Sequence, residues 1–314
     1  MANEKNSAPR RALYEANTEG KTPTKPEKIL NDKEEVTENN IENKMGVFDD
    51  EVNQTDTDEK DNFDDNAEMT GVVLLSGGLD SVAALAWAKN NNIKCHALIV
   101  DYGGSNNKRE IKAAKKIARY YKVPFQVVKI DLPMWNRGLV VKEGKLDIYC
   151  DTINSKDEEG VAGEYVPARN TLFLAYAYAY AESLDFDSII VGFNKGAMGE
   201  EFNGFGYMPD TSPVYCRAFQ YVINTSTSRE KYTIAIVAPF LRLTKADIAE
   251  YCLDNNVPIE DSYSCFKGEE DACGVCRACV SRLQAFDEID SEDPAPYQNK
   301  TAYREILERN KNVS

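Results

Sequence analysis

The stretch from Val72 to Leu85 constrains this chain more than any other part of its sequence. A short apolar run, 72–75, passes through Ser76-Gly77-Gly78-Leu79-Asp80-Ser81 and enters a second apolar run. The first run predicts a buried strand and the second a helix. The two glycines allow backbone N–H groups to approach a phosphate closely, and the helix presents its positive N-terminal end at the same place. The pattern therefore predicts an anion-binding turn rather than an ordinary glycine turn between a strand and a helix.

Two commoner phosphate-binding motifs are absent from the sequence. It contains neither the G-x-x-x-x-G-K-[ST] loop nor the G-x-G-x-x-G dinucleotide turn. His96 is the only histidine, which argues against a serine–histidine or cysteine–histidine triad and against a histidine-rich catalytic metal site. These absences leave the 76–81 turn as the main candidate for chemistry.

Strand and helix patterns alternate from residue 71 onward. Strands are predicted at 72–75, 95–101, 125–130 and 188–191, and helices at 81–90, 108–121, 168–182, 212–223 and 244–255. Tyr176 and Tyr180 are expected on the core face of the 168–182 helix. Alternation at this spacing predicts an α/β fold, a doubly wound parallel sheet. Ligands of such sheets bind at the carboxyl ends of strands, where the 76–81 turn and Asp101 are expected.

The charge of the chain is concentrated in its first seventy residues. The 314 residues carry a formal net charge of −15, and residues 1–70 hold 19 acidic and 9 basic side chains. We expect 1–70 to be a disordered acidic leader that serves either as a solubilising segment or as an arm that binds a protein partner. It lacks the apolar core of a signal peptide, and no apolar run is long enough to span a membrane, so a cytoplasmic protein is expected. The acidic balance argues against direct nucleic-acid binding.

Four cysteines cluster near the C-terminus. Cys265, Cys273, Cys276 and Cys279 have the spacing C-x7-C-x2-C-x2-C, and Gly274 suits the tight turn between two of them. Close spacing of four thiolates favours a Zn²⁺ site over disulfides in a chain without secretory features. Four thiolates close a tetrahedral site, so a structural role is favoured over a catalytic one. The sequence thus divides into the leader (1–70), an α/β domain (71–255) and a small zinc-binding helical region (256–314).

Residues 71–290 resemble one family. The S-G-G-x-D-S string resembles the pyrophosphate loop of ATP pyrophosphatases, whose domain is of the adenine nucleotide alpha hydrolase type. Its combination with the cysteine cluster and four further segments resembles the 7-cyano-7-deazaguanine (preQ0) synthase family. Those segments are Asp101-Tyr102-Gly103, Tyr165-Val166-Pro167-Ala168-Arg169-Asn170, Met208-Pro209-Asp210 and Leu243-Thr244-Lys245-Ala246-Asp247-Ile248.

The resemblance implies a reaction in which 7-carboxy-7-deazaguanine and ammonia give the nitrile at the cost of two ATP, with Mg²⁺ beside the phosphates. It implies catalytic roles for Asp80, Arg169 and Lys245, and a homodimer. It also implies an ATP-binding segment that comprises Leu75, Ser76, Gly77, Gly78, Leu79, Asp80, Ser81, Val82, Ala83, Ala84 and Leu85, together with Asp101.

Two other functions share this adenylation chemistry. Gly196–Tyr207 is longer than the corresponding family segment, and the run after Gly103 lacks the family's histidine. The longer Gly196–Tyr207 segment and the leader, as possible docking elements, motivate a ligase that joins a deazaguanine carboxylate to an amine of a partner protein. A tRNA-modifying ATP pyrophosphatase also shares the loop, but the acidic charge of the chain argues against it.

Overall fold

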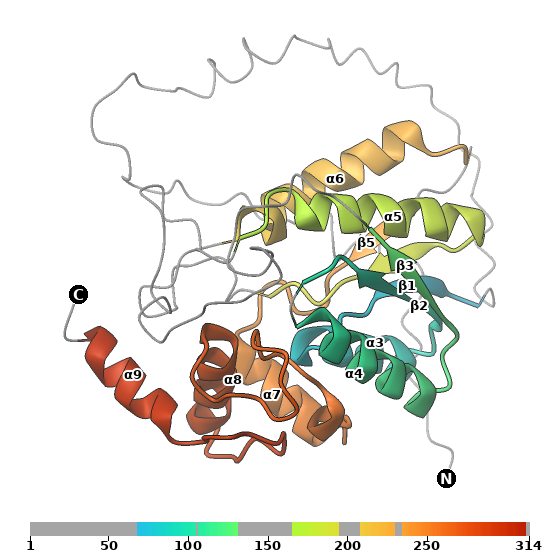
Figure 1. The fold of residues 1–314 in the computed structure, drawn as a ribbon. Helices are drawn as coiled ribbons and strands as arrows, with labels where there is room; N and C mark the ends of the chain where they lie inside the picture. The colour runs from blue at the N-terminus through green and yellow to red at the C-terminus, as the bar shows by residue number, and fades with distance from the viewer. Residues whose placement is uncertain (1–67, 105, 131–164, 195–207, 230–233, 312–314) are drawn as a thin grey trace, which may run out of the picture. The chain divides into compact units, whose positions relative to one another are not determined.

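The core of the protein is a sheet of five parallel strands in the order β3-β2-β1-β4-β5 (Figure 1). The strands are β1 (Thr70–Leu74), β2 (Lys94–Asp101), β3 (Phe125–Lys129), β4 (Ser188–Ile190) and β5 (Ala235–Val237). This computed structural model describes residues 68–104, 106–130, 165–194, 208–229 and 234–311. The expectations for Gly196–Tyr207 and for residues 1–67 of the leader fall outside those residues, and Thr70, the last residue assigned to the leader, begins β1. The predicted doubly wound parallel sheet is confirmed; β5 was not among the predicted strands.

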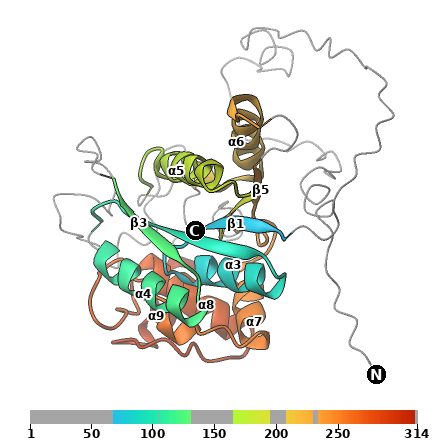
Figure 2. The same cartoon turned by 90° about the vertical axis from the view of Figure 1, so that its right-hand side faces the viewer.

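Helices cover both faces of the sheet. Figures 1 and 2 show α3 and α4 on one face and α5 and α6 on the other. Their bounds are Leu79–Asn90 (α3), Asn107–Tyr120 (α4), Arg169–Ser183 (α5) and Pro213–Ser226 (α6). The residues of α5 that enter the core are Leu174, Ala177 and Ala181, whereas Tyr176 is 42% exposed. The expected core position of Tyr176 is therefore wrong, because small alanines rather than tyrosines face the sheet; Tyr180 packs partly against the core.

The order of the strands creates a crevice above β1 and β4. From β1 the chain proceeds outward to β2 and β3 on one side, and β4 and β5 lie on the other. At such a switch point the loops at the carboxyl ends of the two central strands diverge. Gly192, just after β4, lies so close to α3 that an added Cβ would be 2.6 Å from the backbone carbonyl of Asp80. The two central loops are therefore in backbone contact at Gly192 and the start of α3.

The C-terminal region packs beside α3 and α4. It contains α7 (Lys245–Asp254), α8 (Arg277–Glu288), α9 (Ala302–Lys311) and the short 3₁₀ turn η4 (Ile259–Asp261), whereas another 3₁₀ turn, η3 (Pro209–Thr211), lies between β4 and α6. The buried Arg282 guanidinium on α8 donates to both carboxylate oxygens of Asp293, at 2.7 and 2.9 Å, and also to Ser262 Oγ. Asp293 also accepts from the Tyr297 hydroxyl at 2.7 Å, so the buried charges are fully bonded and fix the chain on both sides of α8. Among the described helices, none is long and apolar enough to cross a membrane.

Candidate functional site

The predicted anion-binding turn links β1 to α3. Gly77 has a φ of +90° and packs so closely on α4 that a Cβ there would lie 2.5 Å from the Glu110 carbonyl oxygen, so only glycine fits. Ser81 Oγ accepts from the Gly77 N–H at 3.1 Å, and Ser76 Oγ accepts from the Gly78 N–H at 3.2 Å. Gly78 is the N-cap of α3 and provides no side-chain cap, which leaves the start of the helix available to an anion. The turn thus has the donors and the helix dipole that a phosphate requires.

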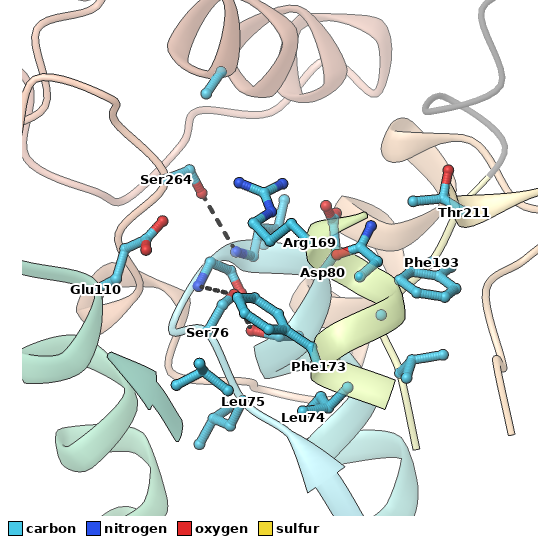
Figure 3. A pocket seen from close by; sticks show the side chains of 18 of the residues that line it. Leu74, Leu75, Ser76, Asp80, Glu110, Arg169, Phe173, Phe193, Thr211 and Ser264 are labelled. Atoms are coloured by element: carbon cyan, nitrogen blue, oxygen red, sulfur yellow. Dashed lines mark hydrogen bonds between the residues drawn. The ribbon is translucent and has the colours of Figure 1, made fainter. Parts of the chain in front are cut away.

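A segment from the cysteine region holds this turn in place. The Tyr263 N–H donates to the Gly77 carbonyl oxygen at 2.8 Å. Ser264 Oγ accepts from the Leu79 N–H at 3.4 Å, shown as a dashed line in Figure 3. The next residue, Cys265, belongs to the cysteine cluster. The C-terminal region therefore contributes directly to the conformation of the turn, a role that the sequence did not indicate.

A cavity of about 360 Å³ opens above the turn at the β1/β4 switch point. Asp80, Glu110, Arg169 and Ser264 lie around it (Figure 3). The residues 191–194 after β4 form another part of the wall, and Phe173 of α5 and Phe266 supply apolar surface. A cavity of this size suits a small organic molecule with a few polar contacts.

Asp80 and Lys245 form an ion pair in the cavity. Lys245 Nζ lies 2.9 Å from Asp80 Oδ2, and the side chains are 16% and 24% exposed, respectively. Lys245 is the first residue of α7, which begins with a capping box: Thr244 Oγ1 accepts from the Asp247 N–H, and Asp247 Oδ2 accepts from the Thr244 N–H. Asp80 Oδ1 is buried without a hydrogen-bond partner among the described residues. A buried carboxylate oxygen left unbonded beside a phosphate-binding turn fits Mg²⁺, which prefers such oxygen ligands.

Arg169 begins α5 at the opposite wall. Its guanidinium lies over the Tyr102 ring, 5.7 Å from the ring centroid. Asp210 Oδ2 accepts from the Asn170 N–H at 3.1 Å, which ties the start of α5 to η3. Burial raises the pKa of Asp210, while this bond and Arg169 act to lower it. Arg169 is thus held at the cavity by its neighbours, close to where phosphate or a substrate carboxylate would bind.

Glu110 and Asn106 line the same cavity and were not predicted as site residues. Asn106 Nδ2 donates to Glu110 Oε1 at 2.9 Å, and the Tyr102 hydroxyl donates to Oε2 at 3.4 Å. Burial raises the pKa of Glu110 to about 7, although Arg169 and these hydrogen bonds act to lower it. In the sequence, both residues look like ordinary polar residues at the start of a helix. One signal in the sequence could have identified them. They are four residues apart, so they share a face of the helix that follows the strand ending at Asp101, and that strand end was expected beside the site.

The remaining predicted ATP-binding residues lie away from the cavity wall. Val82, Ala83, Ala84 and Leu85 are completely buried, because the first turns of α3 must pack against the sheet. They support the turn and do not line the cavity. Asp101 ends β2, and its Oδ1 accepts from the Gly103 N–H at 3.3 Å within its own loop. It too is absent from the lining residues.

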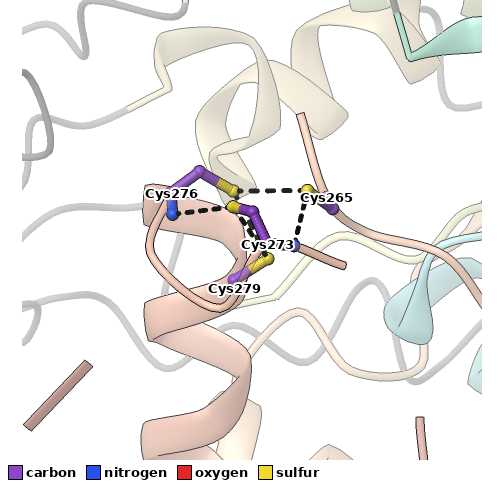
Figure 4. Close-up of side chains that lie close together, drawn as sticks. All are labelled: Cys265, Cys273, Cys276 and Cys279. Atoms are coloured by element: carbon purple, nitrogen blue, oxygen red, sulfur yellow. Dashed lines mark hydrogen bonds between the residues drawn. The ribbon is translucent and has the colours of Figure 1, made fainter. Parts of the chain in front are cut away.

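The four cysteines form a candidate metal centre. Their sulfur atoms all lie within 4.8 Å of one another, and all four residues are buried (Figure 4). The Sγ–Sγ separations are 3.4 Å for Cys276–Cys279 and 3.9 Å for both Cys265–Cys276 and Cys273–Cys279. A tetrahedron of sulfurs about 2.3 Å from a central Zn²⁺ has edges of about 3.8 Å, so the arrangement fits that ion. The four residues predicted from spacing are therefore brought together.

Local backbone geometry supports this centre. The N–H groups of Val275 and Cys276 both donate to Cys273 Sγ, at 3.4 and 3.3 Å. Gly274, which follows Cys273, has a φ of +77°, and a Cβ there would collide with the backbone of Asn299. The predicted need for glycine at this turn is confirmed. The other cysteines of the described residues, Cys95, Cys216 and Cys252, are separately buried, and burial raises their pKa to between about 11 and about 12.

Fold and site together define an ATP pyrophosphatase-type α/β domain with a four-cysteine metal-binding module. A family model described as queuosine biosynthesis protein QueC matches residues 70–290. A 7-cyano-7-deazaguanine synthase of Thermoplasma volcanium is 37% identical over 242 residues, which cover 76% of this chain and 94% of the relative. The enzyme of the same name from Acetivibrio thermocellus is 36% identical over 233 residues, 73% of this chain and 98% of the relative. The chain belongs to the QueC family.

Solved structures add little to this assignment. NMN synthetase from Francisella tularensis is 17% identical and covers 79% of this chain and 86% of its own, with a TM-score of 0.36. A likeness of that strength carries no argument about substrate or mechanism.

Proposed function

We propose that this protein converts 7-carboxy-7-deazaguanine and ammonia to 7-cyano-7-deazaguanine (preQ0) with the consumption of ATP, as a step of queuosine biosynthesis. The observation that carries this proposal is the S-G-G-x-D-S turn, set at the switch-point cavity of a chain that matches the synthase relatives over nearly their whole length. The same comparisons give no support to a protein-modifying ligase or a tRNA-modifying enzyme.

The chemistry explains why such a turn is needed. A carboxylate is a poor acyl donor until one of its oxygens becomes part of a good leaving group. Attack of a carboxylate oxygen on the α-phosphorus of ATP releases pyrophosphate and forms an acyl adenylate, from which ammonia displaces AMP to give the amide. The amide oxygen repeats the attack on a second ATP, and loss of AMP and protons leaves the nitrile. No covalent enzyme nucleophile is required, which agrees with a site without histidine or accessible cysteine among the described residues.

The residues of the turn hold and orient the phosphates. The N–H groups of Gly77 and Gly78 donate to the hydroxyls of Ser81 and Ser76 within the turn, and these N–H groups and hydroxyls would donate instead to a pyrophosphate bound at the start of α3. Lys245 and Arg169 supply positive charge on two sides of the cavity, which would stabilise the negative charge on the phosphoryl oxygens of the pentacoordinate transition state. The Asp80 carboxylate would hold Mg²⁺ through Oδ1. When bound, Mg²⁺ offsets the charge of the phosphates.

Further parts of the proposal concern the metal, the assembly and the location. Cys265, Cys273, Cys276 and Cys279 would hold Zn²⁺ as a structural ion, since four thiolates leave no open coordination position. We further propose a homodimer in the cytoplasm, with the leader available to a protein partner.

Mass spectrometry of the products tests the function. Purified protein with 7-carboxy-7-deazaguanine, ATP, Mg²⁺ and an ammonium salt should form the nitrile, and the Asp80→Ala variant should not. The first half-reaction can be followed separately, as exchange of labelled pyrophosphate into ATP that depends on the carboxylate substrate. Formation of an adduct on a protein, with no nitrile, would overturn the proposal.

A further inference from the structure

The start of α4 presents a wall of acceptor atoms to the cavity that phosphate binding does not use. Asn106 is the N-cap residue of α4, and Glu110 lies four residues further along on the same face. The two side chains are bonded to each other, and Glu110 also accepts from the Tyr102 hydroxyl. Carboxylate and amide oxygens repel phosphate, so this wall must serve another reactant.

Asn106 supplies an unused acceptor on this wall. The residue is 1% exposed, and its Oδ1 has no hydrogen-bond partner among the described residues. A buried polar atom left unbonded costs about 1–3 kcal/mol, so a donor is expected there in the working enzyme. The neighbouring Glu110 carboxyl favours a donor that carries positive charge. The matching ligand is a small cation with several N–H groups.

Ammonium has these properties. It is the predominant form of ammonia at neutral pH, and its four N–H groups can bond to several acceptors at once. The aromatic rings of Tyr102 and Phe173, whose centroids lie 5.6 Å apart, border the same part of the cavity. Aromatic faces attract small cations.

We propose that Asn106 and Glu110 bind the ammonium substrate, and that Glu110 removes the proton that converts it to nucleophilic ammonia. This inference rests on the proposed function and deepens it by naming the site of the second substrate.

The surrounding charges make Glu110 the suitable base. The positive charge of Arg169 on α5 acts to lower the pKa of Glu110. The other charged residues that line the cavity are Asp80 of α3, Lys245 of α7 and Arg277 of α8. Asp80 is ion-paired with Lys245, and the lysine and arginines are cations that accept no proton. The burial that raises the pKa of Glu110 to about 7 places it in the range where a general base works best near neutral pH.

The proton balance of the amination step is complete without another reactant. Glu110 accepts one proton from ammonium, and the nitrogen lone pair then attacks the carbonyl carbon of the acyl adenylate. Collapse of the tetrahedral intermediate breaks the bond between this carbon and the phosphate-linked oxygen. The second proton leaves the nitrogen for the departing AMP phosphate. Glu110 returns its proton to solvent before the next cycle.

The decisive variant is Glu110→Gln, which preserves size and can still accept a hydrogen bond from Asn106. We expect kcat/KM for total ammonium at pH 7 to fall by at least about 10²-fold, the scale of general base catalysis. The defect should shrink as the pH rises, because free ammonia then needs no base. Carboxylate-dependent ATP–pyrophosphate exchange should stay within about twofold of wild type, because it precedes amination. Glu250→Gln, which removes an exposed carboxylate on α7, is the matched control and should change neither rate.

Other results would overturn either the role of Glu110 or the proposed function. Unchanged ammonium dependence in Glu110→Gln would overturn the inference. An equal loss of exchange and amination would also overturn it, and would assign Glu110 to nucleotide, metal or deazaguanine binding. Absence of exchange in the wild type would instead overturn the proposed function. If the variant fails to fold, the wild type still decides: its kcat/KM for total ammonium should rise with pH and level off above about 7, the pKa of Glu110, and the exchange rate should lack this transition. A rise that continues at the same slope well above pH 7 would show that free ammonia binds without a base and would overturn the inference.

Discussion

Replacement of Gly192 by alanine should lower the activity of the site, because the added methyl group would push the backbone at Asp80 and Ser81 out of position. The new Cβ would lie 2.6 Å from the Asp80 carbonyl carbon and oxygen, and 2.8 Å from the Ser81 nitrogen. Comfortable carbon contacts begin near 3.5 Å, so the loop after β4 and the start of α3 must separate by about 0.9 Å. Both are parts of the main chain, and no side chain can rotate out of the way.

The expected loss follows from that displacement. A shift of about 1 Å in a positioned catalytic group can cost about 10²-fold in rate. Carboxylate-dependent ATP–pyrophosphate exchange should therefore fall by one to two orders of magnitude in Gly192→Ala. Overpacking should also lower stability by about 1–3 kcal/mol, which circular dichroism would detect as a Tm lower by several degrees.

Gly71→Ala provides a control with a similar clash at the other end of β1. Its Cβ would lie 2.7 Å from Ser188 Oγ and 2.8 Å from Ile190 Cδ1, both side-chain atoms that can move. This variant should lose some stability and keep the exchange rate. If Gly192→Ala exchanged pyrophosphate within about twofold of wild type, the argument that the β4 backbone positions Asp80 would be refuted.

Three further predictions concern residues of the site and its support. Asp80→Ala should lower AMP formation by at least about 10²-fold with little change in the circular dichroism spectrum, because it removes the proposed Mg²⁺ ligand; near-normal turnover would contradict that role. Zinc should be present at about one ion per chain by elemental analysis, and changing any one of the four cluster cysteines to serine should give unstable or insoluble protein; metal-free protein purified without chelator would overturn the zinc assignment. Asp293→Asn should lower the free energy of unfolding by about 3–5 kcal/mol, because it leaves the buried Arg282 charge uncompensated. Burial raises the pKa of Asp293, but the Arg282 charge together with the hydrogen bonds from Arg282, Tyr297 and the Ala295 N–H holds it below its usual range, so the pair's contribution is present at neutral pH and is lost as the pH falls through that lowered pKa; denaturant titrations that show no difference at pH 7 would contradict this.

The features predicted well from the sequence are those fixed by local chemistry. The glycines and serines of the 76–81 turn are dictated by its backbone conformation, and the start of the predicted 244–255 helix is fixed by Thr244 and Asp247, which are only three residues apart. The metal cluster was predictable because three of its cysteines lie within one tight turn and the start of a helix. Alternation of apolar segments was sufficient for the parallel sheet.

The features missed depend on contacts between distant segments. The ion pair of Lys245 with Asp80 joins residues 165 positions apart, and the support of the turn by Ser264 spans 185. In the sequence, Glu110 looks like any solvated glutamate. Its burial follows from the packing of α4 against the 76–81 turn, which the sequence does not show. The strand β5 has only three residues, and its pairing with β4 rather than its length identifies it.

One cavity should perform two successive adenylations, each at an oxygen bound to the same carbon, and labelled oxygen tests this most directly. With 7-carboxy-7-deazaguanine carrying ¹⁸O at both carboxylate oxygens, each oxygen should leave as part of AMP. Mass spectrometry should detect two molecules of singly labelled AMP for each nitrile formed. One labelled AMP for each product, with the second ¹⁸O retained in an amide, would contradict it.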